Sequence, residues 1–325
     1  MVSLFTMQNL LNLSKYLKKK IPKNNQLYFR HRKNSSRINE KYQTFSRVTK
    51  KFDNNILIKE GGKRVKGFFR RCFKNKPLIS IITVVFNDEK DLENTIKSVL
   101  LQDYDNLEFI IIDGGSSGKV ITKIKKYESH IDYWISQKDR GIWDAWNKGI
   151  RLSTGKFICF LNVGDFFTEN SINTIVRTIN KNENIDIIFG AVKKKKIYSG
   201  FYPKKISMNL NIFPSFVSTF VSIDMYKKYG LFDLNFEYFN DYEFVYRLIK
   251  KKKLNWVATN QNQVITVFDL NGYSSKIGII KQMIEELKIR LKYENFFLIF
   301  FKIFLKFFRF YYLKLFKTNK FLKYN

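Results

Sequence analysis

The sequence predicts an α/β protein with a mainly parallel sheet that is covered by helices. Three observations support this fold class. Short apolar runs rich in β-branched residues alternate with helical segments, the runs are apolar throughout, and polar residues stand where the runs end. Runs without polar alternation are typical of strands that are buried on both faces. Strands are expected at 78–86, 107–112, 131–135, 157–161 and 185–189.

Amphipathic segments between these runs predict the covering helices. Leu92, Ile96, Val99 and Leu100 have the spacing of one helix face. Further helices are expected at 120–127, 142–150, 172–179 and 241–251, with a loop and strand at 214–223 and helix from 279 to about 316. Such alternation implies parallel strands, whose carboxyl ends are where ligands bind. Asn87, Asp113 and Asp165 stand at three of these ends.

Two basic segments flank the expected α/β domain at 77–275. Residues 1–76 are predicted to be a basic, partly ordered N-terminal extension, and residues 276–325 an amphipathic C-terminal helical region. In the C-terminal region, aromatic residues surround one basic side of a helix, made of Lys302, Lys306, Arg309, Lys314 and Lys317. This pattern favours a helix in an anionic membrane interface. Packing on the domain with solvated lysines is the alternative.

Composition limits the classes of function. The formal charge is +31, from 59 Lys and Arg against 28 Asp and Glu, which suits nucleic acid, an anionic membrane or phosphorylated substrates. An AT-rich coding sequence would explain part of the Lys excess equally well. Two cysteines and two histidines, none within a motif, argue against a disulfide framework, a His-based metal site or a Ser-His-Asp triad. With no signal peptide or bilayer-length apolar run, a cytoplasmic location is expected.

Two aspartates at strand ends are candidates for ligand binding. Asp165 follows an apolar strand and an Asn-Val-Gly turn. A carboxylate there suits Mg or Mn, with diphosphate oxygens completing the shell, although capping of the next helix is equally consistent. Asp113 precedes Gly-Gly-Ser and suits contact with a nucleotide base or ribose, with an ordinary turn Asp as the alternative. Gly114 to Lys119 does not have phosphate-loop spacing.

A third pair of carboxylates begins the helix at 241–251. Asp241 precedes the amphipathic segment, and Glu243 lies in its first turn. Either suits a general base that removes a proton from an acceptor hydroxyl. The competing interpretation is N-terminal capping and interaction with the helix dipole. The residues alone leave both readings open.

The order of these signals resembles the family 2 glycosyltransferases, specifically the bacterial surface-polysaccharide group that includes colanic-acid-type enzymes. The resemblance covers roughly residues 55–260 and is most specific in its first half. The lead-in Glu60–Phe69 and the later Tyr229–Asp233 and Asp241–Glu243 are also similar. The matching runs are Ser80–Asn87 (SIITVVFN), Ile111–Ser116 (IIDGGS), Asp132–Ser136 (DYWIS), Asp139–Gly149 (DRGIWDAWNKG), Thr154-Gly155 and Phe160–Asp165 (FLNVGD).

The resemblance implies a nucleotide-diphospho-sugar transferase (GT-A-like) fold and an inverting, metal-dependent transfer of a hexosyl group. It makes Asp241 the catalytic base, Asp165 the metal ligand and Asp113 a nucleotide contact. Phe86 and Asn87 would line the base pocket, and Arg140 and Lys148 would lie near the donor, unless they form a solvated face. The implied partners are a nucleotide-sugar donor and a saccharide acceptor. A lipid-linked acceptor would place the enzyme on the inner face of the cytoplasmic membrane, in cell-surface polysaccharide synthesis.

Three positions depart from the family pattern. Gly164 stands where many relatives have the earlier Asp of the metal motif, which predicts a weakly held ion. Ser117-Gly118 replaces Thr-Asp-Gly, and Phe216-Val217 replaces His-Gln, which leaves the acceptor type open.

Two other functions remain as alternatives. The charge and the aromatic content favour a nucleic-acid-binding protein, although no nucleic-acid-binding motif is present, so nucleic acid is not the expected partner. The departures at Gly164 and Phe216 suit a transferase fold that has lost its activity. A glycoside hydrolase is disfavoured because Asp113 stands at a strand end.

Overall fold

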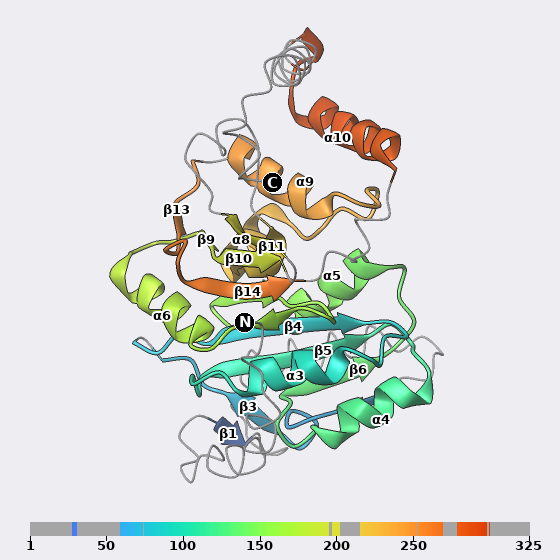
Figure 1. The fold of residues 1–325 in the computed structure, drawn as a ribbon, viewed down its shortest axis with the longest axis vertical. Coiled ribbons are helices and arrows are strands. Elements are labelled where there is room, and N and C mark those ends of the chain that lie inside the picture. The colour runs from blue at the N-terminus through green and yellow to red at the C-terminus, as the bar shows by residue number, and fades with distance from the viewer. Residues whose placement is uncertain are drawn as a thin grey trace, which may run out of the picture.

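A computed structural model describes residues 28–30, 59–73, 75–194, 197–201, 215–251, 253–268, 278–297 and 299. Its main sheet has the strand order β13-β9-β12-β7-β4-β5-β6-β2 (Figure 1). Most of the predicted N-terminal extension and most of the predicted C-terminal helix, including its basic side, lie outside these residues.

The centre of the sheet is formed by four parallel strands. These are β4 (Ile79–Val85), β5 (Leu107–Asp113), β6 (Tyr133–Ser136) and β7 (Phe157–Phe160). Every residue of the four is buried, as their uninterrupted apolar character predicts. In the register, Val85 pairs with Asp113 and Asp113 pairs with Ser136. The carboxyl ends of three strands therefore meet at one edge, and the predicted mainly parallel α/β sheet is confirmed.

Helices cover both faces of this sheet, and each face has its own apolar core. One core includes side chains of α3 (Leu92–Leu100), α4 (Gly118–Lys126) and α6 (Ser171–Lys181). The other includes side chains of α5 (Ile142–Leu152), α8 (Ile223–Tyr229) and α9 (Asn240–Lys251). The helical periodicity in the sequence thus predicted α3, α4, α5, α6 and α9, but it did not predict α8.

The second half of the domain extends the sheet and adds a smaller one. β9 (Ile187–Phe189) and β7 both pair antiparallel with β12 (Thr219–Ser222), and β13 (Trp256–Ala258) pairs parallel with β9. The short 3-10 helix Phe216–Ser218 leads into β12. The smaller sheet consists of β11 (Ile197–Phe201), β10 (Ala191–Lys194), β14 (Val264–Phe268) and β8 (Phe166–Phe167).

Helix α10 (Ile279–Tyr293) lies beyond α9 at one end of the described part of the molecule (Figure 1). The sequence predicted continuous helix from 279 to about 316. In the structure α10 ends at Tyr293, Glu294 has an extended backbone with φ −131° and ψ 155°, and helical backbone resumes at Phe296. Apolar periodicity continues through this point, so it gave no sign of the break.

Residues before the expected boundary at 77 also belong to the folded unit. β2 (Lys59–Gly61) pairs antiparallel with β6 at the sheet edge, and β3 (Phe68–Arg70) pairs with β1 (Tyr28–Arg30). The sequence did not predict these strands. Each of them is only three residues long, so long-range contacts decide where they form.

Two ion pairs hold this N-terminal segment against the sheet. Arg64 is buried, pairs with Glu108 of β5, and donates to the Leu152 carbonyl at 2.6 Å. Arg70 donates to both carboxylate oxygens of Asp132, at 2.9 and 3.3 Å. Glu108 also accepts from Ser80 Oγ at 2.5 Å, so its charge lies within a network of donors.

The Arg64–Glu108 pair generates a stability prediction. Arg64→Ala leaves the fully buried Glu108 without its cation, and loss of one partner of a buried ion pair typically costs about 3–5 kcal/mol. We expect the free energy of unfolding, measured by urea denaturation, to fall by about that much. Lys66→Ala, at an exposed position in the same turn, is the control and should change it little. Equal stabilities of the two variants would contradict this.

Candidate active site

Asn87 and the serines after β5 connect the loops at the carboxyl ends of β4 and β5. Asn87 has a left-handed backbone, with φ +52°, which Asn adopts more readily than most residues. Its backbone N–H donates to Ser116 Oγ at 2.8 Å, and its side-chain oxygen accepts from the Ser117 N–H at 3.1 Å. This cross-link positions the two loops that border the strand ends.

Asp113, the last residue of β5, is fully buried at this edge. One carboxylate oxygen, Oδ2, accepts from the Ser116 N–H at 3.0 Å and from Ser136 Oγ at 2.5 Å. The other, Oδ1, is buried and has no hydrogen-bond partner among the described residues. A buried oxygen without a donor costs free energy, so this carboxylate is suited to receive a donor from a ligand.

Phe86 lies beside the same loop and is 65% exposed. A Cβ atom built on Gly114 would lie 3.3 Å from Phe86 Cδ2 and 2.6 Å from Asp139 Oδ2. Only glycine at position 114 leaves both side chains in their places. The exposed aromatic ring and the Asp113 carboxylate therefore lie on adjoining loops, where a planar heterocycle could stack and donate a hydrogen bond.

Asp139 also lies at this edge of the sheet, beside Gly114, although the sequence pattern did not predict a role for it. Its Oδ1 accepts from the Gly141 N–H at 3.0 Å. Desolvation raises the pKa of Asp139, and it is opposed by this hydrogen bond and by the charge of Lys148. Asp139 begins the run Asp139–Gly149, so a signal was present in the sequence, although the resemblance implied roles only for Arg140 and Lys148 of that run.

The two basic residues of this run have different surroundings. Lys148 is buried on α5, and its Nζ donates to the Lys138 carbonyl at 3.1 Å and lies 3.7 Å from Asp144 Oδ2. Arg140 is exposed, with a guanidinium nitrogen 3.7 Å from Asp144 Oδ1. Lys148 is thus held beside Asp139, whereas the Arg140 side chain extends into solvent.

Asp165 lies in the turn after β7, the strand next to β4. Thr95 of α3 holds this turn, because Thr95 Oγ1 accepts from the Gly164 N–H at 3.1 Å and donates to the Asp165 carbonyl at 2.9 Å. Gly164 has φ +93°, and a Cβ there would meet nothing within 4 Å. An aspartate at position 164 would have space but a strained backbone, which gives a physical reason for glycine there.

The donor set around Asp165 is sparse. Within the described ranges, no group of three or more His, Cys, Asp or Glu side chains is arranged to hold a metal ion. The same turn carries Asn162, whose buried Oδ1 lacks a partner in the described part of the chain. One carboxylate, one amide oxygen and open space over Gly164 fit a divalent cation that takes most of its ligands from a bound diphosphate.

Asp241 lies in the first turn of α9, and its Oδ1 accepts from the Tyr242 N–H at 2.8 Å. Desolvation raises the pKa of Asp241 to about 6, a backbone N–H opposes the shift, and the charge of Glu285 adds to it. A carboxylate with this pKa is a stronger base than an exposed aspartate, and it is largely ionised at neutral pH.

A carboxylate of α10 holds the turn that leads into Asp241. Glu285 accepts hydrogen bonds from three consecutive backbone N–H groups, those of Glu237, Tyr238 at 2.8 Å and Phe239 at 3.0 Å. Nothing in the sequence pattern joined Glu285 to this turn, which lies more than forty residues earlier.

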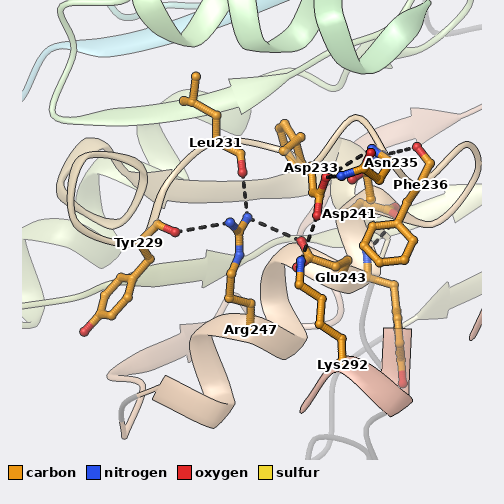
Figure 2. A network of polar contacts seen from close by, with 12 residues as sticks. Tyr229, Leu231, Asp233, Asn235, Phe236, Asp241, Glu243, Arg247 and Lys292 are labelled. Carbon is orange, nitrogen blue, oxygen red and sulfur yellow. Dashed lines mark hydrogen bonds and ion pairs between the residues drawn. The ribbon is translucent and has the colours of Figure 1, made fainter. Parts of the chain in front are cut away.

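Glu243 takes part in a different set of contacts, shown in Figure 2. It is fully buried, lies 3.3 Å from Arg247 and 3.5 Å from Lys292, and accepts from the Tyr293 hydroxyl. Arg247 donates to the carbonyls of Tyr229 and Leu231. These contacts join α8, α9 and α10, so of the two carboxylates that the sequence left open, Glu243 is held within a structural network.

An aromatic cluster connects α5 with α9. Trp146 stacks on Phe160 with ring centroids 4.0 Å apart, and Phe216 packs against Trp146 at 5.7 Å and Phe244 at 6.4 Å. Trp143 Nε1 donates to the Glu237 carbonyl at 2.7 Å. Phe216, one of the positions that depart from the expected family pattern, is therefore a buried packing residue in this chain.

Comparisons with known proteins agree with this arrangement. The family model described as "Glycosyl transferase family 2" matches residues 80–254. An uncharacterized glycosyltransferase of Rickettsia typhi is 28% identical over 189 residues, which cover 54% of this chain and 59% of that protein. Another, from Mycobacterium tuberculosis, is 31% identical over 180 residues, covering 53% of this chain and 68% of that protein. The chain thus spans only part of each relative.

Two solved structures share the fold at low sequence identity. A mannosyltransferase from Pyrobaculum calidifontis, in complex with GDP-Man and Mn²⁺, has a TM-score of 0.53 at 11% identity, over 78% of this chain and 71% of that one. Residues 1–349 of S. aureus TarS, in complex with UDP-GlcNAc, have a TM-score of 0.51 at 13% identity, over 62% and 61%. The family match covers more than half of the chain. The protein has the GT-A fold and belongs to glycosyl transferase family 2.

Proposed function

We propose that this protein transfers a hexosyl group, with inversion, from a nucleotide-diphosphate sugar to a saccharide acceptor in cell-surface polysaccharide synthesis. The observation that carries the proposal is the buried Asp113 carboxylate, which keeps one oxygen without a partner at the strand edge where ligands bind in this fold. Family membership supplies the reaction class.

The donor nucleotide is proposed to bind over the carboxyl ends of β4 and β5. Phe86 offers an exposed ring for stacking, and Asp113 Oδ1 offers an acceptor for an N–H or O–H donor of the base or ribose. Asn87 orders the two loops around them. Lys148 is buried beside Asp139 and adds positive charge on the side where phosphates would lie. Arg140 is exposed and would exchange its contact with Asp144, at 3.7 Å, for a phosphate.

Asp165, with Asn162, is the proposed site of a divalent cation, Mg or Mn. The cation would neutralise charge on the leaving diphosphate. Because the chain supplies one carboxylate where many relatives supply two, we expect the ion to bind tightly only together with the nucleotide. The Pyrobaculum mannosyltransferase structure contains Mn²⁺ together with GDP-Man, which supports joint binding of an ion and a nucleotide sugar.

Asp241 is the proposed general base. It removes the proton of the acceptor hydroxyl while that oxygen attacks the anomeric carbon from the face opposite the diphosphate. The bond to the diphosphate breaks with its electron pair on the leaving oxygen, so the anomeric configuration is inverted. The raised pKa of Asp241 suits this role, since a stronger base accepts the proton more readily.

We propose Glu285 as a positioning residue for that base. Its three backbone hydrogen bonds hold Glu237 to Phe239 directly before the first turn of α9. Asp241 therefore enters the helix from a turn whose shape depends on α10. The charge of Glu285 also helps to hold the pKa of Asp241 above its usual value.

A lipid-linked saccharide is the proposed acceptor, and the inner face of the cytoplasmic membrane the proposed location. None of the helices in the described part of the chain has the length and apolar character needed to span a bilayer. The support for a membrane-bound acceptor is the excess of positive charge, +31 over the whole chain, which favours anionic surfaces.

The donor site generates a binding prediction. Uridine or guanosine diphosphate should bind with Mn²⁺ in calorimetry, and Asp165→Ala should remove the dependence on the metal, because it removes the only carboxylate of that turn. Asp113→Asn should weaken nucleotide binding both with and without Mn²⁺. Asp224→Asn, an exposed position on α8, is the matched control. Absence of nucleotide binding by the parent protein would overturn the proposed donor site.

The base generates a prediction about pH. Because the reaction needs ionised Asp241, kcat/KM for transfer should rise with pH through about 6 and level off above it. Asp241→Asn should lower kcat by about 10²–10⁴-fold while nucleotide binding is retained. A profile without an acidic limb near pH 6, or an active Asp241→Asn variant, would identify another base.

The role of Glu285 is tested by the pH at which kcat/KM rises, which is the acidic limb of the pH profile. Glu285→Gln keeps the side-chain shape but removes the negative charge that helps to raise the pKa of Asp241, and it replaces one of the two accepting oxygens with an NH₂ donor. We expect the limb of kcat/KM to move to lower pH and kcat to fall. The control is Glu286→Gln on the same helix, where the carboxylate pairs with Arg290 at 2.8 Å. Reduced activity with an unmoved limb would show a purely structural role.

A further inference from the structure

α10 carries a row of apolar side chains that the rest of the described chain does not cover. Met283, Ile284, Leu287 and Leu291 are between about one third and one half exposed. Their spacing of three and four residues places them on one side of the helix. The opposite side carries Glu285 and Ile289, which are buried. The helix is thus attached by one face and exposes an apolar stripe on the other.

Positive charge and aromatic rings adjoin this stripe. Lys281 and Lys288 are exposed and lie seven residues apart, so they follow the same edge of the helix beside the apolar side chains. Just beyond the last turn, Phe296 is 59% exposed and Phe297 is 81% exposed. An apolar stripe bordered by lysines and ended by aromatic residues matches the requirements of a helix that lies in a lipid–water interface.

The position of α10 makes this face accessible. Figure 1 shows α10 at one end of the molecule, beyond α9 and away from the main sheet. The ion pair between Lys292 and Asp233, at 2.7 Å, and that between Lys250 and Glu294, at 2.5 Å, tie the inner side of the helix and its end to the domain. The apolar stripe therefore lies on a helix whose other side is attached to the domain.

We propose that the outer face of α10 is a docking surface for an anionic lipid bilayer. Met283, Ile284, Leu287 and Leu291 enter the boundary of headgroups and acyl chains, and Lys281 and Lys288 contact anionic headgroups. This inference rests on the proposed function in one respect only: a bound bilayer would bring the enzyme close to a lipid-linked acceptor. The residues that carry it are separate from Asp113, Asp165 and Asp241.

Charge selects the bilayer over two other occupants. A second copy of the chain would bring the same lysines and the same +31 charge to the face, so two copies repel. Residues 300–325 of the same chain contain no Asp or Glu and several Lys, so they too have like charge with Lys281 and Lys288. Anionic headgroups have the opposite sign and favour the lysines, while the acyl chains accept the apolar side chains.

The test is vesicle co-sedimentation of the full chain, without donor or acceptor. The vesicles are phosphatidylcholine alone, or phosphatidylcholine mixed with phosphatidylglycerol. The variant Ile284→Gln/Leu287→Gln/Leu291→Gln changes only exposed positions, so the domain should keep its fold, which circular dichroism checks. The control is Val65→Gln, an exposed apolar residue of the N-terminal segment.

We expect binding to the anionic vesicles to fall by about tenfold in the triple variant, with any remaining binding carried by the basic residues 302–317 that all variants share, and to be unchanged in Val65→Gln. Lys281→Gln/Lys288→Gln should lower binding to the vesicles that contain phosphatidylglycerol and leave binding to pure phosphatidylcholine vesicles unchanged.

Equal binding by the triple variant and the parent would overturn the proposal. So would a parent dimer in sedimentation velocity that the triple variant abolishes, since a second copy would then cover the stripe. Failure of nucleotide binding, measured separately, would overturn the donor site and leave this result intact.

Discussion

The parallel hydrogen-bond ladder through β4, β5 and β6 is the constraint on which the rest of the structure depends. Its register brings Val85, Asp113 and Ser136 to the same level, so all three strands end together. The loops that follow are close together, and a side chain at position 114 would contact both Phe86 and Asp139, which favours glycine there. The polar groups of the donor side are consequences of where these strands stop.

The proposed acceptor side depends on helix packing. The residues that hold it in place are not the residues proposed to take part in the reaction. α9 carries the proposed base, but α9 is held through Glu243, Arg247 and Lys292 (Figure 2). The turn before it is held by Glu285. Two carboxylates with the same chemistry thus have different tasks because of their surroundings. Glu243 is surrounded by cations, whereas Asp241 is desolvated and accepts from backbone N–H groups.

The sequence was most informative where structure is local. The strands of the first half are continuous apolar runs and the helices have clear periodicity, so both were predicted close to their observed bounds. β2 was missed because its three residues have no pattern of their own and depend on β6, with Arg64 reaching Glu108 nearby. Asp113 was predicted from its place at a strand end. Asp139 and Glu285 were not, because their roles follow from contacts with Gly114 and with the turn before α9.

Trp143 has a consequence for how the molecule can be observed. Its indole donates to the Glu237 carbonyl, and its ring packs 5.6 Å from Phe232, so it touches both ends of the segment that precedes α9. Trp134 and Trp146 are almost completely buried, and Trp256 packs against Phe189, so none of these three contacts the segment before α9 in the way that Trp143 does. Indole emission responds to local polarity and to hydrogen bonding. The chain therefore has an intrinsic fluorophore at the segment that leads to Asp241, and a shift in its emission would report movement of that segment without any label.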